Sequence, residues 1–210
     1  MYSILEHYLS TNHILMIGMI VTFILTFFLL EHPFSFLPSD QGRAFAVNGS
    51  LSKGKLRGVG FIFVLCFLIS SVLFLPIDVE YVIYAILLFA MMISGYLDDA
   101  SKTPWNEYKK GLIDLVISVV AVLTYMNFNS TTICFGADEI VIPKALFLIL
   151  GVILIWFSVN VTNCTDGVDG LCASLCSVTL LAFGVLFAPV LQKYAMANFL
   201  FLSVLFAYLY

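Results

Sequence analysis

Seven long apolar runs constrain this chain more than any other feature of its sequence. Each is close to the roughly 20 mostly apolar residues that a helix needs to cross a bilayer. Backbone groups in lipid must be hydrogen-bonded within their own segment, so such runs form helices. The runs cover residues 14–31, 58–76, 80–97, 111–128, 143–160, 171–189 and 195–210. The sequence therefore predicts an all-α polytopic integral membrane protein with a single membrane domain over residues 1–210.

The overall composition supports the same class. The chain is 62% hydrophobic and only 10% charged, whereas a soluble domain is about 45–50% apolar and about 25% charged. The net charge is −4, and no nucleic-acid partner is expected.

Lysine and arginine lie mostly in alternate connecting segments. Residues 32–57 and 98–110 carry most of them, while residues 1–13, 77–79 and 129–142 carry none. Basic loops mark the cytoplasmic side of a membrane protein. We therefore expect an outside amino terminus and, by parity, a third cytoplasmic loop at 161–170. Residues 129–142 form the outer loop, where Gly136 between two alternating stretches suggests a small hairpin.

The third cytoplasmic loop is a polar island between two apolar runs. It holds Asn160, Asn163, Asp166 and Asp169, with no lysine or arginine among them. A carboxylate kept at the edge of a membrane is a functional hypothesis by default. One aspartate could instead cap the helix that starts near Leu171. A cap accounts for one acid and leaves the rest of the group unexplained.

A second acidic pair, Asp98 and Asp99, ends a predicted spanning helix. The carboxyl end of a helix carries partial negative charge and favours cations, so capping does not explain these acids. Nearby lysines could offset them, which is the alternative. Together with Asp166 and Asp169 they place four carboxylates on one face, which indicates Mg²⁺ or perturbed pKa values.

The first cytoplasmic loop alternates glycines with basic residues, including Lys53 and Lys55, as it enters the next helix. Backbone N–H groups and cations near a helix amino terminus favour phosphate. Ordinary positive-inside flanking is the alternative for this loop alone. The three loops together predict an enzyme acting on a phosphorylated lipid and a water-soluble phosphorylated donor.

The polar island also carries a resemblance to a known family. Residues 160–171 resemble the Asn-Ala-x-Asn-x-Thr-Asp-Gly-x-Asp-Gly-Leu signature of the phospho-N-acetylmuramoyl-pentapeptide-transferases. These form the bacterial peptidoglycan branch of the polyprenyl-phosphate N-acetylhexosamine-1-phosphate transferase superfamily. Residues 95–102 resemble the family's Gly-Phe-x-Asp-Asp-x-x-Lys motif, and residues 110–112 its Lys-Gly-Leu. Thr165 favours the peptidoglycan branch.

The resemblance implies a reaction at the cytoplasmic face of the bacterial inner membrane. Undecaprenyl phosphate attacks the β-phosphate of UDP-N-acetylmuramoyl-pentapeptide, giving lipid I and UMP, with Mg²⁺ required and a homodimer expected. The implied catalytic residues are Asp98, Asp99 and Asp166, with Asp98 as the base. The implied metal-binding residues are Asn163 and Asp166. The implied substrate-binding residues are Lys53, Lys55, Lys102, Asn160, Asn163 and Asp169.

The sequence departs from the family pattern in three ways. The entry to the second helix differs, so the nucleotide-binding lysine is either Lys53 or Lys55. A lysine that usually follows the Lys-Gly-Leu motif is replaced within the apolar residues 115–117. The family has about ten spanning helices, and this sequence stops in the seventh, so we expect the amino-terminal two-thirds of the full enzyme.

Two other functions compete with this interpretation. A small transporter or ion-relay subunit would use carboxylates in mid-helix, whereas these four lie at helix ends. An inactive truncated homologue would retain the motifs but would not catalyse the reaction.

Overall fold

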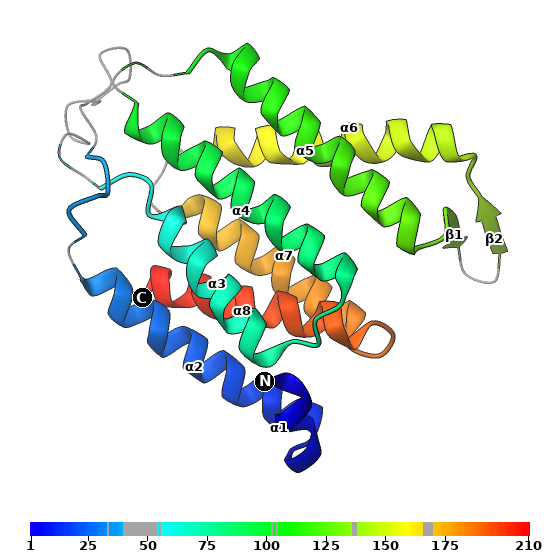
Figure 1. The fold of residues 1–210 in the computed structure, drawn as a ribbon, viewed down its shortest axis with the longest axis horizontal. Coiled ribbons are helices and arrows are strands. Elements are labelled where there is room, and N and C mark those ends of the chain that lie inside the picture. Colours follow the sequence, from blue (N-terminus) through cyan, green and yellow to red (C-terminus); the bar gives the residue numbers. More distant parts are fainter. Residues whose placement is uncertain are drawn as a thin grey trace. The chain divides into compact units, whose positions relative to one another are not determined.

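The computed structural model describes residues 1–32, 34–39, 54, 56–101, 103, 105–135, 138–165 and 170–210. Within them the chain is mainly helical, with one small hairpin (Figure 1). The helices are α1 (Tyr2–Tyr8), α2 (Thr11–Glu31), α3 (Gly60–Phe74), α4 (Val79–Ala100), α5 (Glu107–Phe128), α6 (Lys144–Thr165), α7 (Leu171–Phe187) and α8 (Gln192–Leu209). The strands are β1 (Thr132–Phe135) and β2 (Asp138–Val141).

The predicted class of an all-α polytopic membrane protein is confirmed. Each of the seven predicted segments coincides with one helix from α2 to α8. Among the described residues, α2, α4, α5 and α6 are long and apolar enough to cross a membrane, and α3 and α7 are shorter apolar helices. The number of spans, the outside amino terminus and the sidedness of the loops stay predictions.

The helices differ from the predicted runs mainly at their ends. Helix α4 continues to Ala100 and α6 to Thr165, so Asp98, Asp99 and Asn163 lie in terminal helical turns. Polar side chains can extend a helix past the apolar region because they can reach water there. Helix α1 was not predicted. The hairpin in residues 129–142 is confirmed, with Thr132 opposite Val141.

The described chain divides into two compact units. Unit 1 comprises residues 1–76, 95–104 and 173–210, and unit 2 comprises residues 77–94 and 105–172. Unit 1 is built on α2, α3 and α8, which lie side by side (Figure 1). The helices approach closely at Gly18, where an added Cβ would lie 3.0 Å from both Leu200 Cδ2 and Phe74 Cγ.

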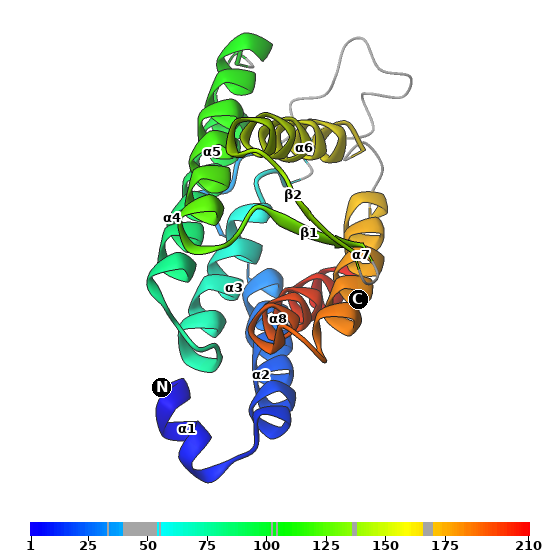
Figure 2. The same cartoon turned by 90° about the vertical axis from the view of Figure 1, so that its right-hand side faces the viewer.

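In unit 2, α6 crosses α5, and the hairpin joins the two helices (Figures 1 and 2). A Cβ added at Gly151 on α6 would lie 3.0 Å from Val122 Cγ1 on α5. The side chain of Asn106 starts α5 by accepting a hydrogen bond from the Tyr108 N–H at 3.0 Å. This capped end of α5 carries Lys109 and Lys110, of which Lys110 reaches the final turn of α6.

Candidate active site

The acidic pair lies in the last turn of α4, in unit 1. Asp98 is half-buried and Asp99 is exposed. The Ser101 hydroxyl and N–H both donate to the Asp98 backbone carbonyl, at 2.8 and 3.2 Å, which ends the helix. Two carboxylates at the negative end of a helix repel each other and the helix dipole, and a cation relieves both effects.

The ends of the first predicted cytoplasmic loop pack against Tyr96 of α4. We call residues 34–39 and 56–59 the loop base. Ser39 pairs with Leu56, and the Arg57 N–H donates to the Pro38 carbonyl at 2.7 Å. The Tyr96 hydroxyl donates to the Phe36 carbonyl at 2.8 Å. These contacts hold the loop base against Tyr96, which precedes Asp98 by two residues.

Glycine at position 58 makes this contact possible. Its φ of +69° lies in the left-handed region that a side chain disfavours. An added Cβ would also lie 3.3 Å from Tyr96 Cδ2. The Tyr96 ring completes the contact against Phe61, with ring centroids 5.2 Å apart. The tyrosine of the Gly-Tyr-Leu-Asp-Asp motif thus packs against the loop base.

In unit 2, two motifs that are distant in the sequence come into contact. Lys110 Nζ donates to Asn163 Oδ1 at 3.5 Å, which joins the Lys-Gly-Leu motif of α5 to the polar island of α6. Next to it, Trp156 Nε1 donates to the Gly111 carbonyl at 2.9 Å. Asn160 donates through Nδ2 to the Trp156 carbonyl at 2.8 Å, so its Oδ1 is the atom that can accept from a ligand.

Sequence reasoning missed two buried acids in unit 2. Glu80 is 8% exposed, and its Oε1 accepts from Asn129 Nδ2 at 2.7 Å and from the Tyr84 hydroxyl at 3.2 Å. Asp114 is 4% exposed and lies on α5. The signal for Asp114 was available, because it is the one acid inside the predicted run 111–128 and follows Lys110 by one helical turn.

Five predicted site residues lie outside the described residues, namely Lys53, Lys55, Lys102, Asp166 and Asp169. Their predicted roles stay predictions. Within the described part of the chain, no three His, Cys, Asp or Glu side chains lie close enough together to hold a metal ion by themselves. Mg²⁺ in phosphoryl-transfer enzymes is often held by one or two carboxylates plus substrate phosphates and water. Asp98 and Asp99 offer donors of that kind.

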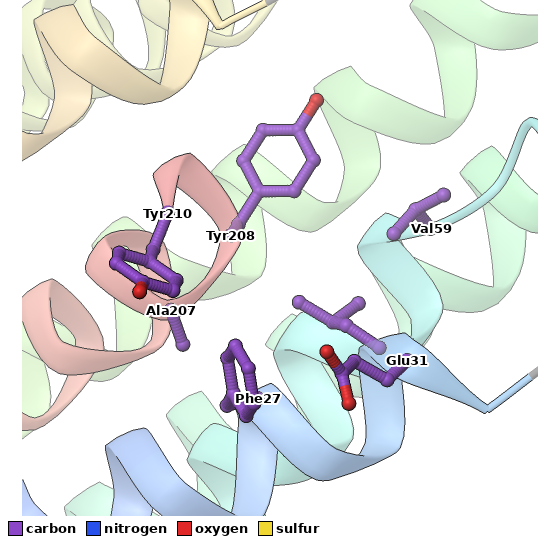
Figure 3. A pocket seen from close by; sticks show the side chains of 7 residues that line it. Phe27, Glu31, Val59, Ala207, Tyr208 and Tyr210 are labelled. Atoms are coloured by element: carbon purple, nitrogen blue, oxygen red, sulfur yellow. The ribbon is translucent and has the colours of Figure 1, made fainter.

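Unit 1 also contains a hollow of about 350 Å³ (Figure 3). Phe27 and Glu31 of α2 line it together with Tyr208 of α8 and Tyr210, which follows that helix. Its ionisable acid, Glu31, disfavours a phosphate ligand by like charge. None of the predicted site residues lines this hollow.

A model of the family described as glycosyl transferase family 4 matches residues 81–210. The phospho-N-acetylmuramoyl-pentapeptide-transferase of Treponema pallidum (strain Nichols) is 34% identical over 189 residues, which cover 88% of this chain and 52% of that protein. The protein of the same name from Microcystis aeruginosa is 32% identical over 144 residues, covering 62% of this chain and 39% of its own. The chain thus spans about half the length of the Treponema relative.

Proposed function

This chain belongs to glycosyl transferase family 4, and on that premise we propose that it makes lipid I. In this reaction, phospho-N-acetylmuramoyl-pentapeptide passes from its UDP-linked donor to undecaprenyl phosphate, and UMP is released. We place the reaction at the cytoplasmic face of the bacterial inner membrane, where basic loops are expected. The names of the relatives, the apolar helices and the positions of the motifs support the proposal.

The observation that carries the proposal is the contact between Lys110 and Asn163. The two residues belong to different motifs, and the folded chain brings a cation and an amide together at one end of the α5–α6 pair. A cation beside neutral hydrogen-bonding groups suits a phosphate oxygen. A donor that carries a diphosphate is therefore the ligand class that unit 2 fits.

In the proposed reaction, an oxygen of undecaprenyl phosphate attacks the β-phosphorus of the donor. A new oxygen–phosphorus bond forms, the bond from the β-phosphorus to the bridging oxygen breaks, and UMP leaves with that electron pair. Asp98 accepts the proton of the acceptor phosphate, and Asp99 adds its charge beside it. Lys102 and Asn163 approach the diphosphate, and Asp169 contacts the uridine.

Magnesium fits this proposal through the chemistry of the available donors. Asn163 and Asp166 are the proposed ligands, with the acidic pair close to the substrate phosphates. When bound, Mg²⁺ would neutralise charge that develops on the phosphate oxygens. A homodimer is part of the proposal, and chemical cross-linking in native membranes tests it.

The test replaces Asp98 and Asp166 separately by asparagine in the protein expressed at the full length of its gene. We expect UMP release in vesicles containing undecaprenyl phosphate to fall by about 10²–10⁴-fold for each variant, the usual range for a lost acid–base or charge-stabilising group. Asp138→Asn, an exposed acid of the hairpin, serves as the matched control. Wild-type rates in both site variants would refute the assignment of these acids.

The same vesicles separate the competing functions. An ion relay would give a proton or cation flux that Asp98→Asn abolishes, without UMP release. An inactive homologue would give neither signal. Family membership and the position of the acidic pair at the end of α4 favour transfer over a relay.

A further inference from the structure

Asp114 lies in an environment that is unfavourable for an ionised carboxylate. It lies in α5, one of the helices able to span the membrane, and only 4% of its surface is exposed. An ionised acid in such a place is costly and is kept when it interacts with another charge or polar group. A charged or polar neighbour is therefore needed to stabilise the Asp114 carboxylate.

That neighbour is Lys110. The two residues stand four positions apart on α5, so their side chains share one face of the helix. An opposite charge one helical turn away favours the ionised form of a buried carboxylate. Lysine has a long flexible side chain, and an acid one turn further into the helix restricts where the ammonium group can lie.

The Lys110 ammonium group also contacts the polar island of α6. Its Nζ lies 3.5 Å from Asn163 Oδ1, at the long end of the hydrogen-bond range. The indole of Trp156 fixes the neighbouring turn of α6 against Gly111, which is the next residue of α5. The Lys110 ammonium group thus contacts the polar island on α6, and a buried carboxylate follows one turn later on its own helix.

We propose that Asp114 is a positioning residue that holds the Lys110 ammonium group at Asn163, where it meets the diphosphate of the donor. The inference rests on the proposed function for the identity of that ligand. Asp114 acts through Lys110 and is not expected to touch the substrate. Removing its charge should weaken binding of the UDP-linked donor and leave binding of the lipid acceptor nearly unchanged.

A merely structural role predicts a different result. Asparagine has almost the size of aspartate and lacks its charge, so Asp114→Asn removes the desolvation cost of a buried ion. The variant should therefore unfold at the same temperature as the wild type or higher. If Asp114 only supported the fold, any loss of activity would follow a loss of thermal stability.

The first experiment measures transfer in vesicles by Asp114→Asn, Asp114→Glu and the matched control Asp138→Asn. We expect Asp114→Asn to lower kcat/KM for the UDP-linked donor by about 10- to 100-fold, mainly through KM, as for a lost hydrogen bond to a charged group. Asp114→Glu should recover most of this loss because it restores the charge. In a Lys110→Met background, Asp114→Asn should have no further effect.

The second experiment does not depend on transfer. Amine acylation followed by mass spectrometry reports how firmly the Lys110 ammonium group is held, with Lys144 in the same chain as reference. An ammonium group that is no longer held by a carboxylate is freer to meet the reagent, so Lys110 should be acylated several-fold faster in Asp114→Asn. Unchanged labelling would overturn the inference, and so would additive kinetic losses in the double variant. If the wild type releases no UMP but the labelling changes, the proposed function fails while the positioning role stands.

Discussion

The two units bury different kinds of polar side chain. In unit 1, the buried polar residues of α2, α3 and α8 are hydroxyls, namely Thr22, Thr26, Ser70, Ser71 and Ser203. Thr26 donates to the Thr22 carbonyl at 2.8 Å, and Ser203 to the Phe199 carbonyl at 3.0 Å. Unit 2 also buries hydroxyls, but both buried acids of the described residues, Glu80 and Asp114, lie there.

The two kinds of buried group differ in how they are satisfied. A hydroxyl that bonds to its own helix, as that of Thr26 does, is satisfied locally and is tolerated in a packed helix interface. A carboxylate in a membrane helix needs partners from elsewhere, and its burial is unfavourable without them. The α2–α3–α8 interface of unit 1 therefore buries hydroxyls, whereas unit 2 holds both buried acids, one of them a helical turn from Lys110. Three substitutions test this contrast.

The largest effect on stability is expected at Gly18. Gly18→Val places a branched side chain where even a Cβ would lie 3.0 Å from Phe74 and Leu200. We expect about 2–3 kcal/mol of destabilisation, the cost of overpacking a close-packed interface, measured by thermal unfolding in detergent. Gly60→Ala is the control, because a Cβ there has no neighbour within 4 Å. A neutral Gly18→Val would show that α2, α3 and α8 pack less tightly than described.

An intermediate effect is expected at Glu80. Glu80→Leu removes the acceptor of Asn129 and Tyr84, which should cost about 1–2 kcal/mol. Glu80→Gln keeps an acceptor oxygen and should cost less. Glu80 lies in the first turn of α4 and Asp98 in its last, about 27 Å away along the helix, so transfer by the folded variants should be unchanged. A folded Glu80→Leu protein with impaired transfer would show that both buried acids of unit 2 serve the reaction.

The smallest effect on stability is expected at Trp156. Trp156→Phe keeps the aromatic ring and loses the N–H that donates to Gly111, at a cost of about 1 kcal/mol. Because this bond fixes α6 beside Lys110, KM for the UDP-linked donor should rise, which steady-state kinetics would detect. Trp105→Phe is the matched control, since phenylalanine keeps an aromatic face for Lys109. Equal KM values in the two variants would contradict the positioning role of Trp156.

Most of the fold could be predicted from the sequence because long apolar runs are stable in lipid as helices. The hairpin was also predictable from the alternating pattern around Gly136. The ends of the helices were harder to predict from the sequence, because α4 and α6 continue through Asp98 and Asn163 beyond their apolar parts. The short start of the chain gave no periodic signal for α1, a helix of only seven residues.

The candidate site was predictable as a set of motifs, but its contacts were not. The pairing of Lys110 with Asn163 depends on where α6 crosses α5, which no local pattern specifies. Asp114 was overlooked because a single acid does not interrupt an apolar run of spanning length. The assignments of Asp166, Asp169 and the three loop lysines rest on the family resemblance.

The packing of α2 against α8 has a consequence for how the protein is made. Gly18 meets Leu200 with α3 to α7 between them in the sequence, so this contact must wait until all of those helices have left the ribosome. Lys110 and Asn163 belong to consecutive helices and can meet much earlier. Short-range contacts also form faster than distant ones. During synthesis, the contact between Lys110 and Asn163 should therefore form while α2 still lacks its partner α8.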